Sequence, residues 1–255
     1  MNASSPKFPL QALTATALTA FLLVAGGCVQ VSMVTEIQDD GSGTSVISYS
    51  MSDQVANALE ELAAMENSPT GEGVPSFDEL TRERVEATAR AHGASLESFE
   101  RERDGGRQGA TMKIAFENVE QLSRTLNELG EGGDELLVIR PTGDGDYLLA
   151  AIPDPRAGAE AEDDEDEEEA ADPGVYDPES MQRAMELTGQ LMANLSELEM
   201  EMKITVPGDI LESSAHRVDG RTAVWRVDSS NMMSMQDGDF DPRVRFSGKG
   251  VKIGG

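Results

Sequence analysis

The sequence predicts an α+β fold, in which an antiparallel sheet of hairpins packs against helices and a disordered acidic insertion interrupts the chain. Segments that alternate apolar and polar residues come in pairs joined by Gly- and Asp-rich turns, as in β-hairpins. Segments with apolar residues at helical spacing lie between them. Residues 153–174 contain eleven acidic residues, one basic residue and no large apolar side chain. Such a stretch buries too little surface to offset the entropy lost on ordering.

The elements follow in order along the chain. The expected hairpins are residues 29–38 with 45–51, 94–103 with 110–117, 135–140 with 147–152, and 210–218 with 221–228. The expected helices are residues 53–66, 76–92, 118–129 and 177–197, and a single strand covers 198–206. Ser52 can cap the first helix, and Ser76 with Glu79 has the pattern of a capping box for the second. Trp225 should be buried between the last hairpin and the last helix.

The amino terminus has the layout of a lipoprotein signal peptide. One basic residue precedes an apolar stretch that ends in Gly26 and Gly27, and Cys28, the only cysteine, follows directly. Small residues admit a signal peptidase, and the Cys28 thiolate can then take a diacylglyceryl group. An uncleaved transmembrane helix is the alternative, although Pro9 and Gln11 argue against it. We expect a signal peptide over 1–27 and a lipid anchor at Cys28. Either alternative places residue 29 onward outside the cytoplasm.

Charge and composition exclude several classes of protein. A formal net charge of -28 excludes nucleic-acid binding, which needs a basic surface. Lipidation uses the only cysteine, so no intramolecular disulfide is expected. His92 and His216 have no metal-ligand spacing, and residues 237–248 fail the pattern of a calcium-binding loop because Pro242 replaces its glycine. We therefore expect no catalytic residues, no metal and no cofactor.

A methionine-rich segment is the candidate lipid-binding site. The helix expected over 177–197 places its methionines along one broad stripe, and the next strand adds two more. The candidates are Met181, Met185, Met192, Met200 and Met202. Thioether side chains adapt to apolar ligands of varied shape, although ordinary core packing is the commoner meaning of such a stripe. Arg243 and Arg245, close to a basic tail over 248–255, are the candidates for an anionic headgroup.

One family resemblance rests on the late part of the chain together with its start, where Gly-Cys-Val-Gln-Val at 27–31 is followed by a hairpin and a helix. The run Met-Lys-Ile-Thr-Val-Pro-Gly-Asp-Ile-Leu-Glu-Ser-Ser at 202–214, then Asp219-Gly220 and Ala223-Val224-Trp225, resembles the late strand, Pro-Gly turn and Trp-bearing hairpin of LppM-like bacterial envelope lipoproteins. The resemblance implies an extracytoplasmic α+β domain with a candidate role in lipid handling and no catalytic residues. It places that domain at 28–247, with the acidic insertion at 154–174. Many members carry a carboxy-terminal membrane helix, which residues 241–255 do not provide.

Two functions from different classes follow. The first is a lipid-anchored envelope protein, on the extracytoplasmic face of the cell membrane, whose non-enzymatic domain binds a membrane lipid or glycolipid. The second is an interaction protein that scaffolds envelope partners and binds no small ligand. An apolar cavity would favour the first, and an exposed apolar patch on a solid core the second. Two small domains divided at the acidic insertion remain the alternative to one domain.

Overall fold

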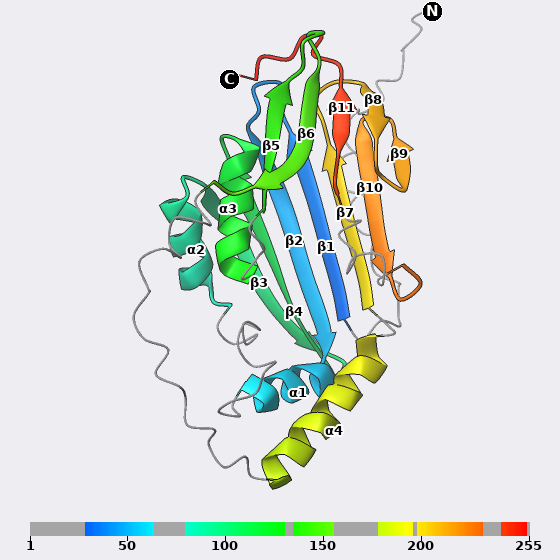
Figure 1. Ribbon diagram of the computed structural model, residues 1–255. Coiled ribbons are helices and arrows are strands. Elements are labelled where there is room, and N and C mark those ends of the chain that lie inside the picture. Colours follow the sequence, from blue (N-terminus) through cyan, green and yellow to red (C-terminus); the bar gives the residue numbers. More distant parts are fainter. Residues whose placement is uncertain are drawn as a thin grey trace, which may run out of the picture.

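The computed structural model describes residues 29–63, 80–130, 135–155, 178–195, 198–231 and 241–253. Within these ranges it contains two sheets and four helices, which confirms the α+β class (Figure 1). Cys28, most of the acidic insertion and the end of the basic tail lie outside the described residues. None of the described helices combines the length and the apolar character needed to cross a bilayer.

The large sheet has seven strands in the order β3-β4-β2-β1-β7-β10-β9. They are β1 (Val29–Ile37), β2 (Gly43–Ser52), β3 (Ser95–Asp104), β4 (Arg107–Phe116), β7 (Leu198–Thr205), β9 (Arg217–Asp219) and β10 (Thr222–Asp228). The expected hairpins β1–β2 and β3–β4 are present. One pair departs from the antiparallel expectation, because β1 and β7 run parallel, with Val29 opposite Leu198. Helix α4 (Pro178–Leu195) returns the chain to the end of the sheet where β1 starts, so β7 enters in the same direction (Figure 1).

The small sheet has the strand order β5-β6-β11-β8. Its strands are β5 (Glu135–Pro141), β6 (Tyr147–Pro153), β8 (Ile210–Ser213) and β11 (Val244–Phe246). The expectation of one strand over 210–218 is wrong, since the chain leaves β8 after Ser213 and joins the large sheet as β9. The Ser214 hydroxyl holds this junction, because Oγ accepts a hydrogen bond from the Arg243 backbone N–H at 2.9 Å and donates one to the Asp241 carbonyl at 2.7 Å.

The other helices are α1 (Asp53–Ala63), α2 (Arg82–Ala91) and α3 (Val119–Gly130). Ser52 caps α1 as expected, since its Oγ accepts from the Val55 N–H at 3.3 Å. The second helix starts later than expected. Thr81 is its N-cap and accepts from the Arg84 N–H at 3.2 Å; Ser76 lies outside the described residues.

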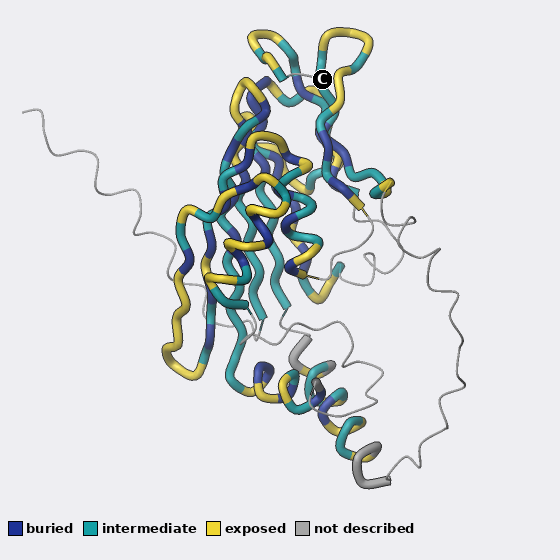
Figure 2. Tube along the Cα trace, turned by 90° about the vertical axis from the view of Figure 1, so that its left-hand side faces the viewer, coloured by how far each residue is buried: buried dark blue, intermediate teal, exposed yellow. Residues whose placement is uncertain are grey.

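The core lies between the large sheet and the layer formed by α2, α3 and the small sheet. We call the sheet face that this layer covers the inner face. Strands β1, β2 and β7 are buried in the upper part of the molecule and only half-buried toward their lower ends (Figure 2). Helices α1 and α4 lie at that lower end and form a separate small cluster through Ala58, Leu62 and Leu187.

The carboxy-terminal segment and the start of the acidic insertion both belong to the folded domain. Val251 and Ile253 pack against the main core, and the Lys252 N–H donates to the Asp39 carbonyl at 2.6 Å. The basic tail expected from 248 is therefore packed on the domain as far as residue 253. Asp154, expected as the first residue of the disordered insertion, instead accepts a 2.8 Å hydrogen bond from Arg124 on α3.

Candidate functional site

Cross-strand pairing arranges the lower half of the inner face into three rows. The upper row is Phe99, Met112, Ile47, Met33, Met202 and Trp225. The middle row is Arg101, Ala110, Tyr49, Val31, Met200 and Val227. The lower row is Arg103, Gln108, Met51, Val29 and Leu198. Side chains alternate between faces along each strand, so all three rows project to the same side.

A hollow of about 150 Å³ lies over the upper and middle rows. Its lining residues are Val31, Met33, Ile47, Tyr49, Leu126, Met200, Glu201, Met202, Trp225 and Val227. Leu126 comes from α3, so this helix roofs the part of the hollow nearest the covered core. Apart from Glu201, the Tyr49 hydroxyl and the Trp225 indole N–H, the side chains of this lining are apolar. The site can therefore receive an apolar group.

Two of the polar groups in this lining, the Trp225 indole N–H and the Tyr49 hydroxyl, are uncharged. Trp225 is 3% exposed, and its indole N–H donates to Ser214 Oγ at 3.3 Å. Burial raises the pKa of the Tyr49 hydroxyl above its ordinary value, because the phenolate would be poorly solvated there. Tyr49 therefore stays neutral. The burial of Trp225 is confirmed, but Trp225 belongs to the main core, whereas the buried residue of α4 that the structure describes, Leu187, packs on α1.

The structure separates the predicted methionines into two groups. Met200 and Met202 lie side by side with Val31 and Met33 of β1 in the hollow. Met185 is 72% exposed, and Met181 and Met192 lie on α4, with side chains outside the described residues. Met185 therefore does not contribute to the hollow, because α4 packs on α1 through Leu187 and leaves the Met185 side chain in solvent.

The predicted headgroup residues both pair with acids. Arg243 pairs with Asp241, two residues earlier in the chain, at 2.6 Å. Arg245 pairs with Asp146 at 2.9 Å and with Asp144 at 3.6 Å. These last two acids belong to the β5–β6 turn, so the local sequence around residue 245 could not show them. Neither arginine lines the hollow.

The residues that sequence reasoning missed belong to β1 and β2. Val31, Met33, Ile47 and Tyr49 supply the floor of the hollow, yet their alternation indicated only a half-buried strand. A usable signal was their place in the chain. Val31 is three residues after Cys28, so a strand rising about 3.3 Å per residue puts the hollow within about 10 Å of the expected anchor.

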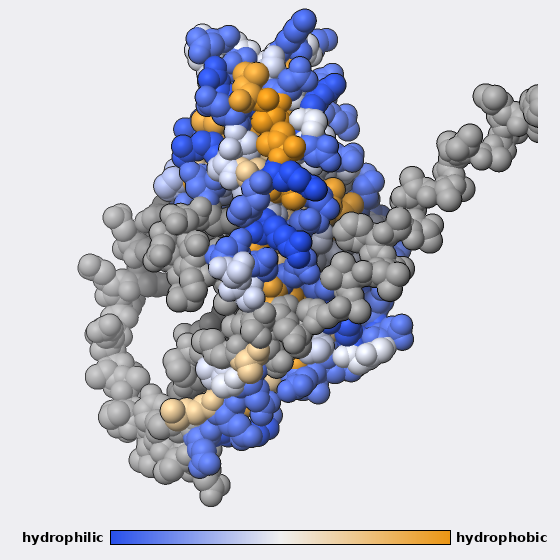
Figure 3. All heavy atoms as spheres, turned by 90° about the vertical axis from the view of Figure 1, so that its right-hand side faces the viewer, coloured by the Kyte–Doolittle hydropathy of each residue, from blue (hydrophilic) through white to orange (hydrophobic). Residues whose placement is uncertain are grey.

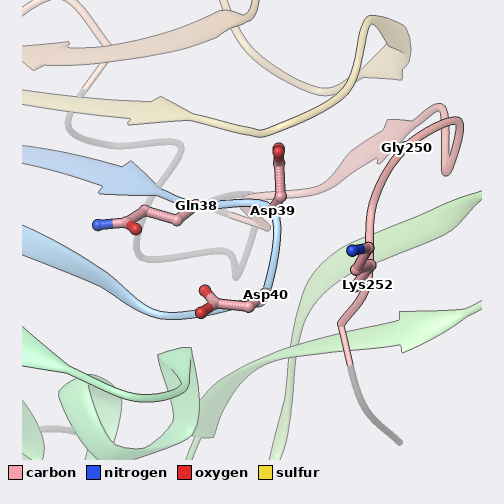
Figure 4. Close-up of a pocket in the computed structure, with 5 residues that line it drawn as sticks. All are labelled: Gln38, Asp39, Asp40, Gly250 and Lys252. Atoms are coloured by element: carbon pink, nitrogen blue, oxygen red, sulfur yellow. The ribbon is translucent and has the colours of Figure 1, made fainter.

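A second hollow, of about 530 Å³, is a weaker candidate. It lies between the β1–β2 turn and the carboxy-terminal segment and is lined by Gln38, Asp39, Asp40, Gly250 and Lys252. The labelled side chains point in different directions and do not meet at one point (Figure 4). The Ser42 hydroxyl lowers the pKa of Asp40 by hydrogen bonding to its carboxylate, which is ordinary turn stabilisation.

The two histidines have structural partners. His92 lies 2.5 Å from Glu128 Oε2 through its Nε2 atom, and His216 Nδ1 accepts from the Arg226 N–H at 3.0 Å. Among the described residues, no three His, Cys, Asp or Glu side chains come together as a metal site would require.

Comparison with known proteins adds a distant structural likeness. No family model and no curated protein matches the sequence. Among solved structures, the fold is similar to the NMR structure of the folded domain of the Mycobacterium tuberculosis LppM protein, with a TM-score of 0.41 and 10% sequence identity. The match covers 89% of this chain and 94% of that one. At this distance the likeness says nothing about ligand or activity.

Proposed function

We propose that this chain is a lipid-anchored envelope protein whose extracytoplasmic domain holds the apolar chain of an amphiphile, a membrane lipid or glycolipid. The observation that carries the proposal is the apolar hollow over Met200, Met202 and Trp225. Val29 opens β1 directly after Cys28, so an anchor at Cys28 keeps the lower end of the sheet close to a bilayer.

The size of the hollow limits what it accepts. A cavity of about 150 Å³ with an apolar lining stays dry and takes up a molecule the size of benzene, so this hollow receives a few carbons of an acyl chain. The half-buried lower row extends the apolar floor toward the strand ends through Met51, Val29 and Leu198. Covering this floor is favourable at about 25 cal/mol per Å², and association costs remove part of that gain.

Lipid co-purification tests the proposal. A chain of residues 29–255, which contains every described element, should carry bound lipid that mass spectrometry detects after extraction. Met200→Gln places an amide in the hollow. It should lower the amount of bound lipid several-fold, because an acyl chain in the hollow would displace the water that hydrogen-bonds to the amide and offer no partner in return. Met185→Gln is the matched control on α4 and should leave bound lipid unchanged. A folded protein that carries no lipid and takes up none from vesicles would refute the proposal.

The anchor has its own test. Cys28→Ser removes the only thiol, so the variant should remain unprocessed and should incorporate no fatty-acid label in cells. The unchanged protein should incorporate the label and fractionate with the cell membrane. Labelled, processed Cys28→Ser protein would show that the anchor assignment is wrong.

The scaffold alternative is favoured by a different observation. Leu211 on β8 and Val218 on β9 are 49% and 46% exposed. Apolar atoms gather at the height of these strands on the side shown in Figure 3, within a mainly hydrophilic surface. If this patch binds an envelope protein, Leu211→Ser with Val218→Ser should abolish crosslinks from that face in intact cells and leave lipid binding intact. Unchanged crosslinks would remove the alternative.

A further inference from the structure

Arginines stand along one margin of the apolar floor, at strand β3. The middle row ends in Arg101 and the lower row in Arg103. The upper row ends in Phe99, and Arg82 of α2 lies over its ring, with the guanidinium carbon 6.0 Å from the ring centroid. Arg82 Nη2 also donates to the Phe99 carbonyl at 2.7 Å. Each row thus reaches a cation at the same margin.

The alternation of β3 places opposite charges on opposite faces. Glu100 and Glu102 occupy the outer face, since they alternate with Arg101 and Arg103 along the strand. Arg82, Arg101 and Arg103 are all exposed. Arg103 also pairs with Asp53 of α1, whose Oδ1 lies 3.6 Å from Arg103 Nη2. Although the chain has a net charge of -28, the inner face of β3 thus presents the guanidinium groups of Arg101 and Arg103 at the margin of the apolar floor.

The separation suits one phospholipid molecule. Neighbouring strands lie about 4.8 Å apart, so Arg101 on β3 is about 10 Å from Tyr49 on β2 and about 14 Å from Val31 on β1. An arginine side chain spans part of that distance. A lipid with one acyl chain in the hollow can consequently place its headgroup against the β3 margin. At physiological salt, charges act over about 8 Å, so a headgroup at this margin responds to the charges close to it and not to the net charge of the whole chain.

We infer that the β3 margin binds the phosphate of an anionic membrane phospholipid, with Arg101 and Arg103 as the principal contacts and Arg82 beside them. The inference rests on the proposed function and defines its ligand class. Guanidinium groups suit this role because their N–H donors match phosphate oxygens in pairs. The headgroup site lies at the membrane-proximal end of the large sheet and differs from the site expected at Arg243 and Arg245.

The single tryptophan supplies the readout. Trp225 lines the hollow and is 3% exposed, and the chain has no other tryptophan. Brominated acyl chains quench tryptophan emission only on contact. Full-length protein would be reconstituted in phosphatidylcholine vesicles that contain either brominated-chain phosphatidylglycerol or brominated-chain phosphatidylcholine. We expect half-maximal quenching at about tenfold less of the anionic lipid, the difference that one or two charged hydrogen bonds produce.

Two double variants locate the headgroup. Arg101→Gln with Arg103→Gln should remove the anionic preference and leave quenching by the neutral lipid unchanged. Arg243→Gln with Arg245→Gln, matched in number and type, should keep the preference. The emission maximum and thermal unfolding midpoint of each variant confirm folding before quenching is compared.

The outcomes separate the inference from the proposed function. Equal quenching by the two lipids in the unchanged protein, or a preference that survives in the Arg101/Arg103 variant, would overturn the headgroup site and leave chain binding in place. Loss of the preference in the Arg243/Arg245 variant alone would also overturn it. Absence of quenching by either lipid would refute chain binding itself, and the headgroup site with it.

Discussion

The two halves of the inner face are built from the same strands and differ in what lies above them. The upper half contains one further row, and each of its residues is at most 1% exposed; they are Ile114, Ser45, Thr35, Ile204 and Ala223. The middle row lies four residues away from this row along β1, β2 and β7. Its residues on these strands, Val31, Tyr49 and Met200, are half-buried. Helices α2 and α3 and the small sheet cover the first row completely and the middle row only in part.

If burial alone decided the side chains, the fully covered row would be the more apolar one, but the inner face shows the reverse. The fully covered row contains two hydroxyl groups, Thr35 Oγ1 and Ser45 Oγ, which satisfy each other across 3.0 Å. The open rows contain valine, methionine and tyrosine. Apolar groups gain nothing from partial exposure to water, so an apolar ligand that covered these half-buried residues would bind favourably. This contrast is the physical basis for proposing a lipid chain there.

The largest expected effect compares two residues of β7. Ile204→Ala removes a side chain that is 0% exposed and should cost about 2 to 5 kcal/mol in unfolding free energy. Met200→Ala, four residues earlier at the open end, should cost about 1 kcal/mol, because less apolar area leaves water when it folds. Chemical denaturation of both variants checks the difference. Equal losses would mean that the lower half is as closed as the upper half.

Thr35→Val tests the polar pair in the covered half. The substitution leaves Ser45 buried without its partner, which should cost about 1 to 3 kcal/mol. Adding Ser45→Ala removes the unsatisfied hydroxyl and should recover part of the loss. A double variant that is less stable than Thr35→Val would show that the hydroxyls are not coupled to each other.

Asp154 should contribute to the stability of the fold, and the acidic residues after it should not. Asp154→Ala leaves Arg124, 13% exposed and also paired with Glu120, without one of its carboxylates, and should cost about 1 kcal/mol. Replacing residues 157–174 by a short Gly/Ser linker should leave the thermal midpoint unchanged or slightly higher, because like charges are removed. A fall of many degrees in the linker variant, beyond the few that ~1 kcal/mol produces, would show that the acidic stretch contributes to the fold.

The smallest effect concerns α1 and α4 at the open end. Arg183 donates two hydrogen bonds to the Glu61 carboxylate, at 2.6 and 2.8 Å, and these lower the pKa of Glu61 below its ordinary value of 4.5. The pair therefore stabilises α1 against α4 fully above pH 4.5, and that contribution is lost as pH falls through the lowered pKa. The protection factors of the α1 amides, which are corrected for the intrinsic exchange rate at each pH, should fall at acid pH more than in Glu61→Gln. The same fall in both proteins would exclude this pair as the cause.

Several features of the protein could be read from the residues alone. The alternation around Val31 and Ile47 predicted strands, because side chains of a strand alternate with a period of two whatever lies above them. The cap at Ser52 and the turn at Asp219-Gly220 depend on neighbouring residues, so they too were correct. The position of Cys28 after Gly27 still provides the expectation of an anchor.

The site depended on contacts between distant parts of the chain. The parallel pairing of Val31 with Met200 joins residues that are far apart in sequence, and no local pattern specifies it. Met185 and Met200 looked equivalent in sequence, yet α1 covers the apolar side of α4 and leaves Met185 in solvent. From the sequence, Arg245 was a candidate for binding an anionic headgroup, but in the structure it forms an ion pair with Asp146 of the β5–β6 turn. Local pattern sets which face a side chain occupies, whereas burial and charge pairing depend on which other elements reach that face, and only the tertiary structure decides this.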